Sequence, residues 1–418
     1  MKALLILATM VVSLFGFAGG GGSSSGGGGS SGGSSYSGGS HHSSGGSGSS
    51  EFTWESFLLT MGFFGVVLAI VLIGSRKQKQ KEQQKLDEMD QNNTEQEQWI
   101  HGEAERIFVQ YQQDWSDYNL KSIRKYATER YFQHASLMLE AIDRMGRRNV
   151  VSDLAIKRVV LCTAVNNETK VPVTVRIVFV FGGTDSLVKT DTKEVIFSNK
   201  AYEVKEYWDF VYDGKTLRLD GITQSTESTP HLISDIADFA RENKLFYSPD
   251  WGRLALPTKG LIFGNDTILS SADVNNHVVG KWKECLVQIY TYSQTPADPG
   301  SYYVVGQINV PKVYEGVIVE AKNAQLRVKV PRDYDKYEME WGEFSQRYKV
   351  FAASRDALPA FELLNPAFME RLYERNLPYN LEVKDNTIYI FAKVSKAKKE
   401  DYAELLNVLT EAFNELKM

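Results

Sequence analysis

The stretch that decides the fold of the first half of the chain is residues 201–224, AYEVKEYWDFVYDGKTLRLDGITQ. Apolar and polar side chains alternate along it, which is the pattern of β-strands with one buried face. Asp213-Gly214 is a dipeptide that favours a tight turn, so the stretch predicts a hairpin of two antiparallel strands. One face of the first strand is expected to carry Tyr202, Val204, Glu206, Trp208, Phe210 and Tyr212.

Glu206 is the anomaly of this face, because it places a carboxylate among aromatic rings. A buried charge is costly unless it is paired or hydrogen-bonded. One interpretation is a structural ion pair with a basic residue such as Arg176 or Arg218. A second is a polar anchor inside a ligand pocket. A third is a catalytic acid, although no companion His or Asp stands at a persuasive spacing.

Two helices are expected before these strands. Aromatic residues spaced by three and four predict the first helix, and similar periodicity from Ile123 to Met145 predicts the second. His134 lies on the apolar face of the second helix, where a hydrogen-bonded core histidine is a more common role than a metal ligand. The aromatic stripe of the first helix, which we interpret as core, consists of Phe108, Tyr111, Trp115 and Tyr118.

Four strands are expected between the helices and the hairpin, two long ones and then two shorter ones. The period changes to two at Val150, and the alternation slips near Lys157-Arg158, which predicts a bulge. The next strand begins at Val171, and Gly182-Gly183 is expected to close it. Part of this strand is apolar on both faces, so that part should be covered on both sides.

The sequence over about residues 100–226 resembles the Tim-44-like family, the C-terminal domain of the mitochondrial inner-membrane translocase subunit 44 and its bacterial relatives. The matching stretches are FVQYQQDWSDYNLKSIRKYATERYF, GRRNVVSDLAIKRVVL, VTVRIVFVF and VKEYWDFVYDGKTLRLDGITQ. The resemblance implies a cone of the nuclear-transport-factor-2-like type, in which a bent antiparallel sheet wraps a long helix around an apolar pocket. It also implies a docking role at a membrane, because the mitochondrial member tethers a chaperone motor to a channel and touches cardiolipin-rich membrane.

This resemblance also indicates candidate site residues. Glu206, Trp208 and Phe210 fall on the family's glutamate-tryptophan-aromatic strand, and Trp115 falls on the tryptophan of its first helix. These four residues are therefore candidates for a pocket or docking face. The sequence has neither a mitochondrial presequence nor a long chaperone-binding segment before the domain, so a bacterial plasma-membrane protein fits better than a chaperone-recruiting one.

The residues before this domain predict a membrane anchor. Residues 1–18 have the order of a signal peptide cut after Ala18, and the alternative is an uncleaved first transmembrane helix. Residues 19–53 read as an extracytoplasmic Gly/Ser-rich spacer. Residues 54–74 have the length and apolar character of a transmembrane helix, and residues 75–96 read as a polar juxtamembrane stalk.

A cluster of basic residues follows the predicted span. By the positive-inside rule, it places everything after residue 74 in the cytoplasm. The cluster also predicts attraction to anionic membrane lipid, and the alternative is a plain stop-transfer flank. Its members are Arg76, Lys77, Lys79, Lys81 and Lys85.

Residues 227–418 predict a second α+β domain. Helices are expected at 232–246, after Asn365 as N-cap with Pro366 at the first position, and from Lys398 onward. Strands are expected at 281–292, 302–310, 313–321 and 348–353, followed by a hairpin that turns at Asp385-Asn386. This half resembles an uncharacterised domain of membrane-anchored bacterial proteins, which implies a fold only.

Composition and motifs narrow the function classes. A net charge of −5 over 418 residues disfavours nucleic acid as a partner. Two distant cysteines, Cys162 and Cys285, do not make a disulfide framework and suit a reducing compartment. The sequence contains no Gly-rich phosphate loop, no Cys-x-x-Cys, no His-Glu-x-x-His and no nucleophile elbow. We therefore expect no catalytic residues, no cofactor and no metal.

The sequence thus predicts a single-pass protein of the bacterial cell membrane, with the spacer outside and two α+β domains, 97–226 and 227–418, in the cytoplasm. We expect an adaptor or tether that docks an unidentified protein partner or lipid. One alternative is a sensor or carrier that holds a lipid or small apolar ligand in the cone pocket. Another is an uncharacterised enzyme, because acid and base groups from distant strands leave no local signature.

Overall fold

The computed structural model describes residues 94–166, 168–224, 234–248, 274–293, 302–324, 330–393 and 398–416, together with 80, 81 and 84. The predicted signal peptide, spacer and transmembrane segment lie outside these residues, as do most of the predicted stalk and Arg76, Lys77, Lys79 and Lys85. Lys81 is described, and it is an exposed helical residue. Within the described ranges, no helix is both long and apolar enough to cross a membrane.

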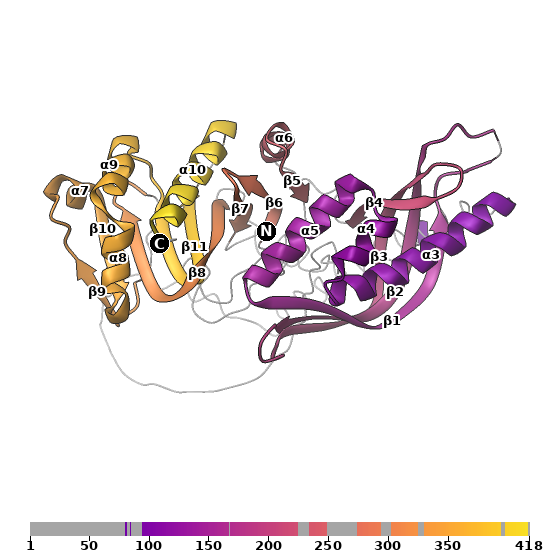
Figure 1. The fold of residues 1–418 in the computed structure, drawn as a ribbon, viewed down its shortest axis with the longest axis horizontal. Coiled ribbons are helices and arrows are strands. Elements are labelled where there is room, and N and C mark those ends of the chain that lie inside the picture. The colour runs from indigo at the N-terminus through magenta and orange to yellow at the C-terminus, as the bar shows by residue number, and fades with distance from the viewer. Residues whose placement is uncertain are drawn as a thin grey trace, which may run out of the picture. The chain divides into compact units, whose positions relative to one another are not determined.

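The described elements form an α+β fold with antiparallel sheets, which confirms the predicted fold class at that level (Figure 1). Residues 93–418 belong to one compact unit. The first sheet has four strands in the order β1-β2-β3-β4, and helices α3, α4 and α5 pack against it. Its strands are β1 (Arg147–Leu161), β2 (Val173–Lys189), β3 (Val195–Tyr212) and β4 (Leu217–Gln224).

The helices of the first half are α3 (Glu95–Ser116), α4 (Leu120–Tyr126) and α5 (Glu129–Arg144). A capping box starts α3, because Thr94 accepts a hydrogen bond from the Glu97 amide while the Glu97 side chain accepts one from the Thr94 amide. The prediction of one helix from Ile123 to Met145 is wrong. Thr128 interrupts it: its amide donates to the Leu219 carbonyl, and its hydroxyl caps α5.

The first sheet carries bulges, one of which was expected. The register of β1 against β2 shifts between Ile156 and Arg158, which confirms the predicted bulge, and shifts again between Ser152 and Ala155. Gly182 does not close β2 as predicted, because the strand continues to Lys189. A Cβ at Gly182 would lie 2.8 Å from the Tyr202 carbonyl oxygen, so a close backbone approach requires glycine there.

Tyr202 corrects the predicted face of β3. The register of β3 against β2 slips by one residue between the pairs Val204–Phe181 and Ala201–Gly183. This slip turns Tyr202 outward, and its side chain is 80% exposed. The other five residues of the predicted face, from Val204 to Tyr212, are buried.

The second sheet runs in the order β5-β6-β7-β8-β10-β9, and β11 also pairs with β8. Its strands are β5 (Phe246–Ser248), β6 (Val274–Trp282), β7 (Cys285–Ser293), β8 (Tyr302–Ala321), β9 (Tyr334–Tyr337), β10 (Tyr348–Ala353) and β11 (Asn380–Lys393). Its helices are α6 (Ser234–Glu242), α7 (Gly342–Arg347), α8 (Ala357–Leu363), α9 (Pro366–Arg375) and α10 (Lys399–Leu416), with a short 3-10 turn at Ser354–Asp356. Helix α10 packs across β8 and β11.

Turn signals account for the errors in the second half. The strand predicted at 281–292 is interrupted by a tight turn at Lys283-Glu284, where both residues have positive φ. The two strands predicted at 302–310 and 313–321 are the single strand β8. The hairpin predicted at Asp385-Asn386 is wrong, because β11 continues through these residues and both flanks stay paired with β8. Asp385 takes a φ of 50° there, and the register shifts beside it leave the extra residues on β8.

Helix α9 confirms its predicted start. The Asn365 side chain accepts a hydrogen bond from the Phe368 amide, and Pro366 occupies the first helical position.

Candidate functional site

Trp208 lies at the centre of the first half, in the concave interior between α3 and the sheet. Its side chain is fully buried. The ring centroid lies 5.0 Å from that of Phe108, 5.4 Å from that of Tyr111 and 5.4 Å from that of Phe179. Phe210, also fully buried, stacks on Trp208 at 6.1 Å. The rings of the helix and of two strands therefore fill this interior.

Glu206 is fully buried beside these rings. The Trp208 indole Nε1 donates a hydrogen bond to Glu206 Oε2 over 3.0 Å. The hydroxyls of Tyr111 and Tyr131 bond to each other over 2.9 Å in the same region. Burial raises the pKa of both tyrosines, and the charge of Glu206 raises it further. The carboxylate thus belongs to a buried polar cluster.

The predicted ion pair between Arg176 and Glu206 is wrong. Glu206 faces the interior, whereas Arg176 lies on the outer face of β2 directly opposite Asp209. Arg176 Nε and Nη2 donate to the two carboxylate oxygens of Asp209, each over 2.7 Å. The alternation of strand side chains therefore decides the pairing.

Trp115 joins the same interior through Tyr111, whose ring centroid lies 5.8 Å from that of Trp115. The Trp115 Nε1 donates to Asn149 Oδ1 over 2.9 Å, and the Asn149 amide donates to Asp185. These bonds tie α3 to β1 and β2. The structure thus brings all four predicted site residues into one packed interior, and the two cavities described below are lined by none of them.

His134 was predicted to be a hydrogen-bonded core histidine, and only part of this holds. Its ring is half-buried and stacks on Phe246 at 5.0 Å with an interplanar angle of 6°. Its Nε2 has no hydrogen-bond partner within the described part of the chain. Burial lowers the pKa of His134 to about 3, helped by His277 and Arg130.

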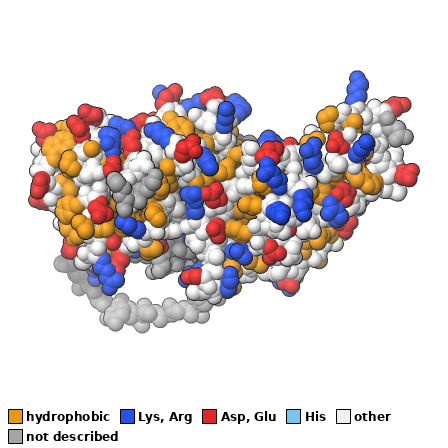
Figure 2. Space-filling view, in the orientation of Figure 1, with side chains coloured by type: hydrophobic (Ala, Val, Ile, Leu, Met, Phe, Trp, Pro, Cys, Tyr) orange, Lys and Arg blue, Asp and Glu red, His pale blue; other side chains and the backbone are white. Residues whose placement is uncertain are grey.

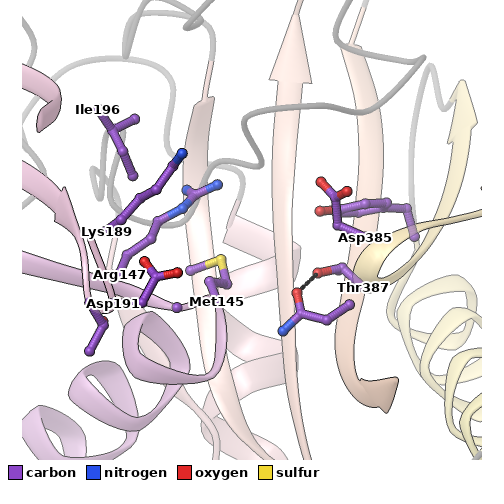
Figure 3. A pocket seen from close by; sticks show the side chains of 11 residues that line it. Met145, Arg147, Lys189, Asp191, Ile196, Asp385 and Thr387 are labelled. Carbon is purple, nitrogen blue, oxygen red and sulfur yellow. Dashed lines mark hydrogen bonds between the residues drawn. The ribbon is translucent and has the colours of Figure 1, made fainter. Parts of the chain in front are cut away.

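A cavity of about 450 Å³ lies outside the aromatic interior (Figure 3). One wall consists of the turn between α5 and β1, the end of β2 and the start of β3, and the other wall is the segment 385–389 of β11. The Thr190 amide donates to the Gly146 carbonyl over 2.8 Å, which joins the parts of the first wall. The lining residues are Met145, Gly146, Arg147, Lys189, Thr190, Asp191, Ile196, Asp385, Asn386, Thr387 and Tyr389.

The cavity contains charges of both signs. Arg147 is 6% exposed, and its side chain points into the cavity, as does that of Lys189 (Figure 3). Burial lowers the pKa of Arg147, while Tyr389, Tyr290 and Asp385 act in the opposite direction. Lys189 Nζ donates to Glu194 over 2.6 Å. The carboxylate of Asp385 approaches from the opposite wall.

A second cavity, of about 400 Å³, lies at the start of α3. It is lined by Thr94, Glu95, Gln96, Trp99, Asn166 and Tyr212. The Trp99 side chain is 44% exposed, and its ring lies 5.9 Å from that of Tyr212.

Helix α8 is apolar on two sides. Ala360 and Leu363 are buried, whereas Leu358 is 68% exposed and Phe361 is 46% exposed. The Phe361 ring packs edge-on against Tyr337 of β9 at 5.8 Å. Figure 2 shows hydrophobic side chains gathered over this part of the second half, at the left of the view. We call Leu358, Phe361 and Tyr337 the α8 face.

Sequence analysis missed both the cavity and the α8 face. The stretch MGRRN, residues 145–149, predicts a helix end, and in the structure Gly146 has a positive φ and is followed directly by Arg147. The stretch ALPAFELL, residues 357–364, has apolar residues all around a helix, which indicates a second covered or docking side.

Among the described residues, no group of three or more His, Cys, Asp and Glu side chains could hold a metal ion. A scan against protein-family models finds no match, and a search of curated proteins finds none. Among solved structures, the chain is similar to the crystal structure of the mycobacterial trehalose monomycolate transport factor A, TtfA, with 12% sequence identity and a TM-score of 0.34. The similarity covers 44% of this chain and 93% of that one, and at this TM-score it carries no argument.

Proposed function

We propose that the chain is an adaptor or tether, anchored in the bacterial plasma membrane by residues 54–74, that docks a protein partner or lipid on the cytoplasmic side. The observation that carries this proposal is the α8 face. Leu358 and Phe361 stand one helical turn apart with 68% and 46% of their side chains in water. Contiguous exposed apolar groups are typical of protein interaction sites.

The aromatic interior favours the adaptor over a sensor that holds a ligand in the cone. Trp115, Glu206, Trp208 and Phe210 are fully buried or nearly so by the chain's own side chains. A lipid tail in this interior would have to displace rings whose centroids lie 5.0, 5.4 and 6.1 Å from that of Trp208. A protein partner meets the outer surface and needs no such displacement.

We also propose that residues 97–226 have the nuclear-transport-factor-2-like cone that the Tim-44-like resemblance implies. The support is a four-stranded antiparallel sheet with α3, α4 and α5 on one face and an aromatic core between them. In this proposal the basic cluster at residues 76–85 attracts anionic lipid and keeps both α+β halves near the bilayer.

The test is purification of the full chain from membranes in mild detergent, followed by mass spectrometry of retained proteins and lipids. The variant carries Leu358→Asp and Phe361→Asp, which place charges on the α8 face. The matched control is Tyr202→Asp, because Tyr202 is 80% exposed on the first sheet. We expect a reproducible protein partner with the wild type and the control, and its loss from the double variant.

Two outcomes would contradict the proposal. A double variant that keeps the partner would remove the α8 face from the docking surface. A stoichiometric lipid or small apolar molecule without any protein partner would favour the sensor, and Trp208 would then be substituted next.

A further inference from the structure

The cavity beside Arg147 is built differently from an accidental surface hollow. Its volume of about 450 Å³ falls within the range of small-molecule sites, which is roughly 300–1,000 Å³. Arg147 is a buried residue, 6% exposed, and its side chain points into the cavity (Figure 3). Lys189, at the end of the adjacent strand, points into the same space.

A hydroxyl in the same wall has no hydrogen-bond partner among the described residues. Thr190 Oγ1 is buried and makes no hydrogen bond within the described residues, although the Thr190 amide is bonded to Gly146. Buried polar atoms are nearly always satisfied by protein, water or ligand. Thr190 lines the same cavity as Arg147 and Lys189, and a hydroxyl there can donate to an oxygen of a bound group.

Asp385, in the opposite wall, restricts the charge that a ligand can carry. Asp385 directs its carboxylate into the cavity from β11, where its φ is positive (Figure 3). A ligand with negative charge alone would be repelled there, whereas a hydrogen-bond donor or cation would be attracted. A hydrogen bond joins the two walls, because Asn386 Nδ2 donates to the Arg144 carbonyl over 2.7 Å.

We infer that this cavity binds a small zwitterionic molecule, with a phosphate or carboxylate held by Arg147, Lys189 and Thr190 and an ammonium group held by Asp385. Arginine suits such oxyanions because its planar fork presents parallel donors. The inference goes beyond docking of a partner, since it concerns a site that the α8 face does not contribute to.

The test uses the full chain in a phosphate-free detergent and isothermal titration with three probes: inorganic phosphate, phosphoethanolamine and a short-chain phosphatidylethanolamine. We expect phosphoethanolamine to bind at least several-fold more tightly than inorganic phosphate, because only it offers an ammonium group. Binding of the short-chain lipid without binding of phosphoethanolamine would overturn the inference in favour of a lipid surface. Failure of the wild type to bind either soluble probe would also overturn it.

Variants assign the two ends of the ligand. Arg147→Met is expected to weaken both soluble probes at least tenfold, and Lys189→Met and Thr190→Val to weaken them several-fold. Asp385→Asn is expected to abolish the preference for phosphoethanolamine while leaving phosphate binding intact, since asparagine tolerates the positive φ of this position. Lys200→Met, an exposed lysine of β3, removes the same charge outside the cavity and should change nothing.

The oxyanion site can be tested without Arg147→Met. Should Arg147→Met fail to fold, Lys189→Met and Thr190→Val carry the oxyanion test. Equal binding by these variants and the Lys200→Met control would overturn the site, because binding would then follow net charge alone.

Discussion

Glu206 and Arg147 are both buried charged residues, with exposed fractions of 0% and 6%, but their surroundings differ. Glu206 stands among rings that fill the space around it, and the Trp208 indole bonds to its carboxylate. Arg147 stands at the edge of a cavity of about 450 Å³. Burial alone therefore does not distinguish a structural charge from a binding group. The volume next to the charge does, because only an open volume can admit a ligand or water.

The largest expected effect tests whether the aromatic interior is a core. Trp208→Ala should lower the free energy of unfolding by about 3–5 kcal/mol, because the removed ring leaves a cavity among Phe108, Tyr111 and Phe179. Urea unfolding of the full chain, followed by circular dichroism, measures it. Tyr202→Ala on the same strand is the control, with an expected change within about 0.5 kcal/mol because its side chain is 80% exposed. A loss below about 1 kcal/mol for Trp208→Ala would mean that the interior is loosely packed and open to a ligand.

The next effect is the loss of stability at low pH, where the buried side chain of His277 would become protonated. His277 is fully buried, and its Nε2 lies 2.9 Å from Gln288 Oε1. Burial lowers the pKa of His277 to about 4, against an ordinary value near 6.5. Between these values the unfolded chain binds the proton and the folded chain does not. Stability is therefore fully present above about pH 6.5 and is lost as the pH falls toward 4, by up to about 1.4 kcal/mol per pH unit from this group.

Unfolding of the wild type and of His277→Gln at pH 7, 6 and 5 measures this loss. The variant should have a shallower dependence on pH, because its amide does not titrate. Parallel curves for the two proteins would show that protonation of His277 is accommodated in the folded state. The His134 ring, whose pKa burial also lowers, contributes to the slope of both proteins with the same sign.

A smaller loss of stability is expected when Glu206, the acceptor of the Trp208 indole hydrogen bond, is replaced. Glu206→Ala should cost about 1–3 kcal/mol, because the Trp208 indole is left buried without its acceptor. Glu206→Gln keeps a carbonyl oxygen for the indole and should recover part of that loss. The same urea unfolding measures both variants. A Gln variant as unstable as the Ala variant would mean that the negative charge, rather than an acceptor oxygen, is needed in the cluster.

These contrasts also explain what could be predicted from the sequence. The alternation along residues 204–212 identified the buried face of β3 correctly, because the face of a strand follows from a period of two. Tyr202 was misplaced because a bulge changes the face without any signal of its own in that stretch. The turn signal at Asp385-Asn386 corresponds to a positive φ at Asp385, yet long-range pairing with β8 on both sides keeps the chain in one strand.

The residues of the aromatic interior could be predicted from the sequence, whereas the cavity could not. The group of Trp115, Glu206, Trp208 and Phe210 was predicted from the resemblance to the Tim-44-like family, and the alternation along the strand places the last three on one face. The cavity could not be predicted in this way, because its walls come from residues 145–147, 189–196 and 385–389. The loop-closing contacts that bring these segments together, such as that of Asn386 with Arg144, leave no local pattern.

The smallest effect on stability is expected at Arg147, and it tests the comparison most directly. Arg147→Ala should change the free energy of unfolding by less than about 1 kcal/mol, because water in the cavity can replace the guanidinium and solvate Asp385. Burial already lowers the pKa of this guanidinium, so the fold bears part of the cost of keeping it charged. The measurement is urea unfolding beside Glu206→Ala under the same conditions. A loss as large as that of Glu206→Ala would mean that Arg147 holds the two walls together, and the cavity would then be a gap around a structural cation.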